Sequence, residues 1–183
     1  MKLGLVMMAS GFSERFGGNK LFYPVEGKTL IERAMDACPP TLFSRAVVVS
    51  QYDELLELAA DRGYLPLPNL HPEEGQSESI RMGLSFLGDC AGVAFAVCDQ
   101  PWLTRGSVKA LIAAFRLHPE DITALSFAGQ RGNPVIFPRS LFPELSALSG
   151  DVGGGAVIRA HSDRLRLVEV SSPRELEDLD TPL

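Results

Sequence analysis

The chain has 183 residues, a formal net charge of −6, and 45% hydrophobic and 22% charged residues. This length can build one domain with a full core, so we expect a single domain over residues 1–183. The acidic balance argues against a nucleic-acid partner or an anionic membrane surface, because both require a basic face.

Apolar runs and helical spacing alternate along the chain. Short apolar runs predict strands at residues 3–9, 45–50, 64–67, 93–98, 122–127, 134–137 and 165–170. Helical spacing predicts helices at residues 29–38, 52–62, 76–87, 104–117, 139–148 and 156–160. Residues 21–26 are expected to be extended, because Pro24 disfavours a helix. The alternation predicts an α/β fold with a mostly parallel sheet and helices on both faces, a Rossmann-like three-layer sandwich.

Cysteine and histidine usage indicates neither a disulfide framework nor a zinc site. Cys38, Cys90 and Cys98 form no CxxC pair, and the three histidines are far apart in the chain. An odd number of thiols favours a reduced, cytoplasmic setting. The apolar run near the N-terminus is at the short limit for a signal peptide, and no stretch is long enough to span a membrane.

The loop after the first strand has the composition of a phosphate site. It carries small residues and two cations: Ser10, Gly11, Ser13, Arg15, Gly17, Gly18 and Lys20. Glycine-rich turns after a buried strand hold phosphates in open α/β sheets. The alternative is that the glycines only supply turns and the two cations are solvated. The dinucleotide fingerprint is absent, and a Walker A loop would need glycine at Phe22.

Two further segments place polar residues where loops would follow the strands. Asp99 comes directly after an apolar strand, where a carboxylate is costly unless it is paired or holds a cation. A turn or helix cap is the simpler explanation for it, since Pro101 follows closely. Gln76 and Ser77 begin a predicted helix and could either contact a ligand or cap that helix.

Six segments in order resemble the small nucleotidyltransferases that complete the molybdenum cofactor. They are residues 9–20 (ASGFSERFGGNK), 75–83 (GQSESIRMG), 98–103 (CDQPWL), 131–137 (RGNPVIF), 150–153 (GDVG) and 178–182 (DLDTP). The resemblance spans almost the whole chain. It is closer to the molybdenum cofactor cytidylyltransferase branch at residues 75–77, and it implies a fold of the nucleotidyltransferase type.

The resemblance implies Mg²⁺-dependent transfer of CMP from CTP to the terminal phosphate of molybdopterin, with release of pyrophosphate. Arg15, Lys20 and Asp99 would be catalytic, and Asp99 and Asp151 would bind Mg²⁺. Arg131 and Asn133 would face the acceptor. The implied nucleotide- and substrate-binding set is Ala9, Ser10, Gly11, Ser13, Arg15, Gly17, Lys20, Gln76, Ser77, Arg131 and Asn133. A molybdoenzyme apoprotein or its chaperone would be the protein partner.

Two positions depart from the resembled pattern. Ser10 stands where the guanylyl branch has glycine and the cytidylyl branch alanine. Gly155 stands where the cytidylyl branch has arginine, which leaves open whether Arg159 takes its place. The alternatives are therefore another NTP, a sugar or polyol phosphate as the acceptor, or a non-catalytic nucleotide-binding protein that delivers the cofactor to its apoenzyme.

Overall fold

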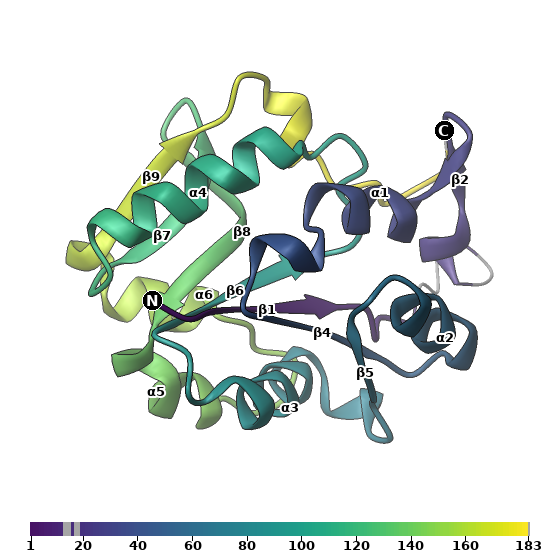
Figure 1. The fold of residues 1–183 in the computed structure, drawn as a ribbon, viewed down its shortest axis with the longest axis horizontal. Coiled ribbons are helices and arrows are strands. Elements are labelled where there is room, and N and C mark those ends of the chain that lie inside the picture. The colour runs from purple at the N-terminus through teal and green to yellow at the C-terminus, as the bar shows by residue number, and fades with distance from the viewer. Residues whose placement is uncertain (13–15, 17–18, 183) are drawn as a thin grey trace.

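The computed structural model describes residues 1–12, 16 and 19–182 and contains a seven-stranded central sheet. The strand order is β5-β4-β1-β6-β8-β7-β9 (Figure 1). The strands are β1 (Leu3–Met8), β4 (Arg45–Ser50), β5 (Leu65–Pro68), β6 (Gly92–Val97), β7 (Ile122–Phe127), β8 (Gln130–Pro138) and β9 (Leu165–Glu169). All neighbouring pairs are parallel except those of β8, which runs antiparallel to β6 and β7. The predicted mostly parallel sheet is confirmed.

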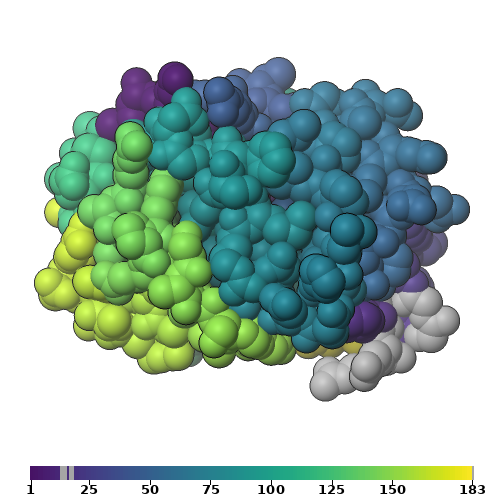
Figure 2. Space-filling view, turned by 90° about the horizontal axis from the view of Figure 1, so that it is seen from below, coloured from purple at the N-terminus to yellow at the C-terminus, as the bar shows by residue number. Residues whose placement is uncertain are grey.

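Helices cover both faces of this sheet. They are α1 (Leu30–Ala37), α2 (Asp53–Asp61), α3 (Gln76–Leu87), α4 (Arg105–Leu117), α5 (Phe142–Ser146) and α6 (Gly155–Ala160). Buried residues of α1, α2 and α4 share one hydrophobic cluster, and those of α3, α5 and α6 share another. Figure 2 views the molecule from the side of α3 and α5. The three-layer α/β sandwich expected from the sequence is therefore confirmed.

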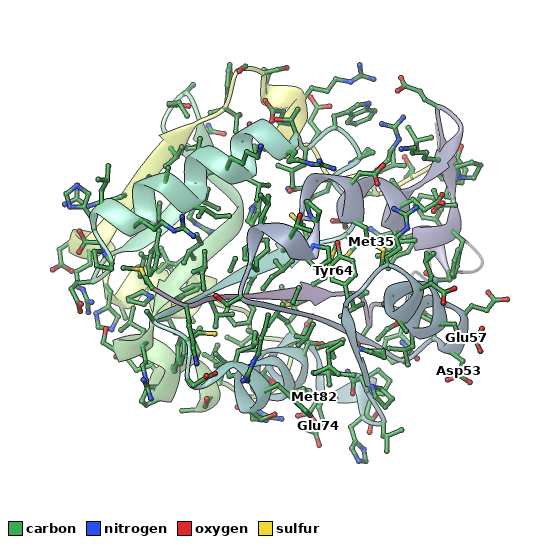
Figure 3. The ribbon with its side chains drawn as sticks, in the orientation of Figure 1. Met35, Asp53, Glu57, Tyr64, Glu74 and Met82 are labelled. Carbon is green, nitrogen blue, oxygen red and sulfur yellow. The ribbon has the colours of Figure 1, made fainter. Side chains whose placement is uncertain are left out.

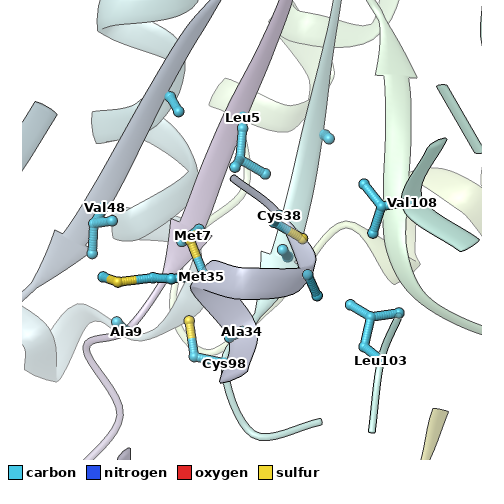
Figure 4. Packing of buried hydrophobic residues seen from close by; sticks show 14 of the residues in the cluster. Leu5, Met7, Ala9, Ala34, Met35, Cys38, Val48, Cys98, Leu103 and Val108 are labelled. Atoms are coloured by element: carbon cyan, nitrogen blue, oxygen red, sulfur yellow. The ribbon is translucent and has the colours of Figure 1, made fainter. Parts of the chain in front are cut away.

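The central strands are apolar because both of their faces are covered. The first five residues of β1, and all of β4 after Arg45, are buried. Beneath α1, the side chains of Met7, Met35 and Cys98 pack together in the core (Figure 4). All three cysteines are buried and free, and burial raises the pKa of the Cys38 thiol to about 12.

Helix α3 lies unusually close to the middle of the sheet. A Cβ atom on Gly83 would lie 2.4 Å from the Cγ2 atom of Val6 in β1. Such a contact is far shorter than van der Waals packing allows, so glycine is required at this point. This close helix–sheet packing helps to position the first turn of α3.

Side chains also fix the opposite layer. Thr29 and Glu32 form a reciprocal capping box at the start of α1. The hydroxyl of buried Tyr64 donates to the carbonyl oxygens of Met35 and Cys38, at 3.1 and 2.9 Å (Figure 3). These bonds satisfy two carbonyls at the end of α1, where the helix leaves them without intrahelical partners.

Three predicted elements need correction. Residues 21–26 are not simply extended, because Asn19 caps a 3₁₀ turn at Lys20–Phe22 before the short β2 (Pro24–Val25) and β3 (Lys28–Thr29) form a two-stranded ribbon. The helix expected at 139–148 is divided into a 3₁₀ turn and α5, since Pro143 fits only the first turn of a helix.

Strand β8 is the third correction, since it begins four residues earlier than expected. Its polar first half pairs with β7 in a hairpin, with Ser126 opposite Arg131 and Phe127 opposite Gln130. Ala128 and Gly129 make the turn with positive φ angles of 49° and 77°. Within the described part of the chain, no helix is long and apolar enough to cross a membrane.

Candidate active site

A pocket of about 620 Å³ lies at the carboxyl ends of β1 and β6. These two strands are parallel neighbours, so the segments that follow them meet at one edge of the sheet. The residues singled out from the sequence that line the pocket are Ala9, Ser10, Gly11, Lys20, Gln76, Asp99, Asn133 and Asp151. Ser13, Arg15 and Gly17 lie outside the described residues.

A salt bridge between Lys20 and Asp99 crosses this pocket. The Lys20 Nζ atom donates to Asp99 Oδ2 at 2.8 Å, and the two side chains are only 18% and 21% exposed. Lys20 also donates to the carbonyl oxygen of Leu179 at 3.4 Å and lies 3.8 Å from the carboxylate of Asp180. The cation and the acid that the sequence singled out are therefore brought into direct contact.

The second carboxylate oxygen of Asp99 has no such partner. Its Oδ1 atom is buried and accepts no hydrogen bond from any residue that the structure describes. A buried carboxylate oxygen without a donor is costly, and binding a cation removes that cost. This orphaned oxygen is the observation that favours a divalent ion at Asp99.

Asp178 is a pocket residue that sequence reasoning missed. It lines the same pocket and accepts a hydrogen bond from Gln100 Nε2 at 2.9 Å. Burial raises the pKa of the Asp178 carboxyl, and the negative charge of Asp99 raises it further. Two coupled carboxylates in one pocket fit Mg²⁺, which prefers oxygen ligands. The sequence feature that could have identified Asp178 is the segment 178–182, which resembles a family signature but was given no role.

The chain from 173 to 180 is held over the site from both ends. The backbone N–H of Leu179 donates to the carbonyl oxygen of Asp99 at 2.8 Å. Nearby, buried Glu175 accepts from the hydroxyls of Thr104 and Ser107 at 2.8 and 2.6 Å. The Arg174 guanidinium lies 4.1 Å from the ring centre of Trp102. These contacts fix Asp178 beside Asp99.

The first residues of the loop after β1 are fixed by the segment that follows β4. Gln51 Nε2 donates to the carbonyl oxygen of Ser10 at 2.7 Å, and the Tyr52 hydroxyl donates to that of Gly11 at 2.8 Å. The Ser10 hydroxyl donates to the Val49 carbonyl oxygen at 3.2 Å. These donors occupy the carbonyl oxygens that would otherwise repel a phosphate.

The opposite wall joins two distant segments. Gly75, with φ of 79°, packs so closely that a Cβ atom would lie 2.6 Å from Asp151 Cα. The Asp151 carboxylate accepts from the backbone N–H of Gln76 at 3.3 Å, so it caps α3 as well as lining the pocket. The Gln76 side chain lies against Gly153, since a Cβ atom there would be 2.5 Å from Gln76 Oε1.

Ser77 does not face the pocket, contrary to the expectation that it contacts the nucleotide. It is fully buried, and its hydroxyl donates to the carbonyl oxygen of Glu74, which Figure 3 labels near the start of α3. Ser79 lines the pocket instead. The Ser77 hydroxyl therefore points toward the 3₁₀ turn that precedes α3.

A smaller pocket of about 170 Å³ adjoins the first, and both apolar and polar side chains line it. The two share Met8, Gln76, Val97 and Asn133. Arg131 lines only the smaller pocket. In its wall, Phe95 and Phe137 make an edge-to-face contact with ring centres 5.9 Å apart. Asn133 therefore stands at the boundary of the two pockets, and Arg131 belongs to the smaller one.

Comparison with known families decides the class of protein. Residues 5–165 match the MobA-like NTP transferase domain. This chain belongs to that family. It is accordingly a nucleotidyltransferase that acts on a nucleoside triphosphate, and the enzyme class expected from the sequence is confirmed.

Related proteins agree with this assignment. The MobA-like chain is 28% identical to the purine catabolism protein PucB of Bacillus subtilis, over 97% of this chain and 91% of that protein. It is 25% identical to a molybdenum cofactor guanylyltransferase of Desulfosudis oleivorans, over 92% of this chain and 81% of that protein. Rv0371c of Mycobacterium tuberculosis has the same fold, with a TM-score of 0.82, 21% identity, and coverage of 99% and 94%. So does a nucleotidyl transferase of Methanothermobacter, with a TM-score of 0.81, 20% identity, and coverage of 98% and 92%.

The arrangement suits nucleotidyl transfer by this MobA-like transferase. In that reaction an acceptor oxygen attacks the α-phosphorus, the bond to the bridging oxygen breaks, and pyrophosphate leaves with the developing charge. Catalysis depends on positive groups placed where this charge builds up. Lys20 supplies such a group inside the pocket, and the two carboxylates beside it can hold another.

Proposed function

We propose that this transferase moves CMP from CTP to the terminal phosphate of molybdopterin in a Mg²⁺-dependent reaction that releases pyrophosphate. The observation that carries the proposal is the contact between Lys20 and Asp99, beside the unpartnered Oδ1 atom of Asp99. It lies in a pocket of about 620 Å³, at the edge of the sheet where such folds bind nucleotides.

In this proposal Lys20 and Arg15 bind the triphosphate and stabilise the departing pyrophosphate. Asp99 holds Mg²⁺ with one of two partners, Asp178 or Asp151, both of which line the pocket. The ion would neutralise phosphate charge when bound. A manganese complex of the structural relative Rv0371c supports a divalent metal, although at 20% identity that protein shares only the fold.

In this proposal the remaining residues of the expected binding set also have roles. Ala9, Ser10, Gly11, Ser13 and Gly17 would surround the phosphates and the nucleoside. The Gln76 amide lines the pocket and would contact the base or ribose, with Ser79 taking the place first expected for Ser77. Choice of cytosine is supported by the resemblance of residues 75–77 to the cytidylyl branch. Arg131 and Asn133 would face the acceptor, since they line the adjoining pocket.

Molybdopterin as the acceptor is supported by the curated relative named molybdenum cofactor guanylyltransferase. The other curated relative, PucB, is named for purine catabolism. A cytoplasmic location and hand-over to a molybdoenzyme apoprotein or its chaperone would follow from this role. The guanylyltransferase relative supports a cofactor-maturation enzyme, and the transferase family does not favour a non-catalytic carrier.

One experiment tests donor and acceptor together. The purified protein is incubated with each of the four NTPs, Mg²⁺ and either molybdopterin or a sugar or polyol phosphate, and pyrophosphate release is followed. Release from CTP that requires molybdopterin is expected. Preference for GTP would overturn the choice of base, and release only with a sugar or polyol phosphate would overturn the acceptor. The variant Asp99→Asn serves as the inactive control.

A further inference from the structure

The geometry points to Arg159 as the second half of a two-arginine subsite, formed with Arg131, that binds the acceptor's phosphate. This inference rests on the proposed nucleotidyl transfer and adds a residue to its acceptor side. A Cβ atom built on Gly155 would lie 3.5 Å from Arg159 Nη1 and 3.7 Å from Arg131 Nη2. Two guanidinium groups from different elements therefore meet over a single glycine.

The two arginines that lie near Gly155 come from different elements of the fold. Arg131 is the second residue of β8, and Arg159 is in the last turn of α6. Residues four apart in a helix lie on the same face, so Arg159 extends back over Gly155. The absence of a side chain at Gly155 leaves the space above it to both guanidinium groups.

Neither guanidinium group is neutralised by the protein. The side chains of Arg131 and Arg159, both exposed residues, form no ion pair or hydrogen bond with any residue of the described chain. Arg62 and Arg81, by contrast, each contact two carboxylates. Two positive groups held together without a counter-ion repel one another, and a bound anion removes the repulsion. Guanidinium groups bind phosphate oxygens through paired N–H donors, which makes phosphate a fitting anion.

The position of the pair indicates which phosphate it binds. Arg131 stands at the smaller pocket, whose walls include Phe95 and Phe137 and whose Gln76 and Asn133 also line the nucleotide pocket. The body of the acceptor could occupy the smaller pocket while its phosphate lies at the arginines. There the pair would offset the repulsion between the attacking phosphate and the anionic α-phosphate.

The first test is kinetic and uses the variants Arg159→Ala, Arg159→Lys and Arg131→Ala. The matched control is Arg116→Ala, which removes an exposed arginine from α4 in the opposite layer. We expect Arg159→Ala to raise the KM for the phosphorylated acceptor by ~10-fold or more, as for a lost charge-assisted hydrogen bond, with the KM for CTP and kcat within about twofold. Arg159→Lys should recover part of this loss. A KM equal to that of Arg116→Ala would overturn the subsite.

The second test does not depend on turnover. Binding of inorganic phosphate is measured by calorimetry with the wild type, with Lys20→Ala, and with Arg131→Ala/Arg159→Ala. We expect a binding event that survives in Lys20→Ala and disappears in the double variant. Phosphate binding that disappears only in Lys20→Ala contradicts the arginine subsite. If no NTP is turned over but the arginine-dependent binding is present, the proposed function fails and the anion subsite stands.

Discussion

The Lys20 ammonium donates to the Asp99 carboxylate at 2.8 Å, although 79 residues separate the two in the chain. Both side chains are about four-fifths buried, so the pair keeps a positive and a negative group inside the pocket before any ligand enters. Electrostatic groups that are held in place in advance need no rearrangement when charge develops in the transition state. The predictions below test this pair and its surroundings.

Asp99→Asn is expected to lower turnover by at least ~100-fold, the scale of losing one electrostatic stabiliser. The substitution keeps the size of the side chain but removes its charge, and with it the affinity for a divalent ion. Pyrophosphate release and circular dichroism measure activity and fold together. Asp163→Asn, at an exposed position, is the control. Unchanged turnover in Asp99→Asn would show that the acid has no role in the reaction.

Lys20→Ala is expected to weaken NTP binding by ~10-fold, because a charge-assisted contact with the triphosphate is lost. The remaining binding should depend less on salt concentration, since one of the charges that salt screens is gone. Titration with NTP at low and high salt measures both effects. The control Lys109→Ala removes an exposed lysine from α4. If the two variants bind NTP alike, Lys20 is only a structural partner of Asp99.

Asp178→Asn is expected to stabilise the metal-free protein near neutral pH. Burial raises the pKa of Asp178, so the folded state binds its proton more tightly than the unfolded chain does. The ionised carboxylate therefore costs stability, and this cost is absent in acid and grows as the pH rises above the ordinary value of 3.8. Thermal melts from acid to neutral pH in a chelator should show the advantage of Asp178→Asn increasing with pH.

Adding Mg²⁺ to the same melts reports on the second metal ligand. The wild type should gain stability with Mg²⁺, because an ion that binds only the folded state stabilises it. Asp178→Asn should gain less, whereas Asp151→Asn should gain as much as the wild type if Asp178 is the partner of Asp99. If Asp151→Asn instead gains less stability from Mg²⁺ than Asp178→Asn does, Asp151 is the partner of Asp99 in binding the ion.

Gly83→Ala is expected to destabilise the fold by about 1–3 kcal/mol through overpacking against Val6. The added Cβ atom would lie 2.4 Å from Val6 Cγ2, and both residues are in the buried contact between α3 and β1. Val6→Ala removes the atom in conflict, so the double variant should be more stable than the sum of the two single effects. Denaturant melts of the four proteins form the cycle. Strict additivity would show that α3 moves away without cost.

Sequence periodicity predicted most elements because burial imposes it. Residues 45–50, 76–87 and 122–127 coincide with β4, α3 and β7, and each has a continuous apolar run or an apolar helical stripe. The first half of β8 was missed because Gln130 and Arg131 are polar, and their strand conformation comes from pairing with β7. The reversed direction of β8 also depends on that hairpin, so no local pattern carries it.

The candidate site was predictable where a polar residue follows an apolar strand, as at Asp99. Asp178 follows no strand, and contacts of residues 174–179 with the segment after β6 bring it to the pocket. Ser79 lines the pocket while Ser77 is buried and bonded to Glu74, which the spacing of the two serines does not reveal. Tertiary contacts of this kind leave no trace in composition or spacing.

The segment around Asp178 and Leu179 also has a consequence for synthesis of the protein. The sheet ends with β9 at residue 169, and Leu179, which accepts from Lys20 and donates to the carbonyl oxygen of Asp99, comes ten residues later. The sheet can thus be complete while the nucleotide site is still open on one side. Translation products that stop shortly after β9 should fold without acquiring the ability to consume NTP.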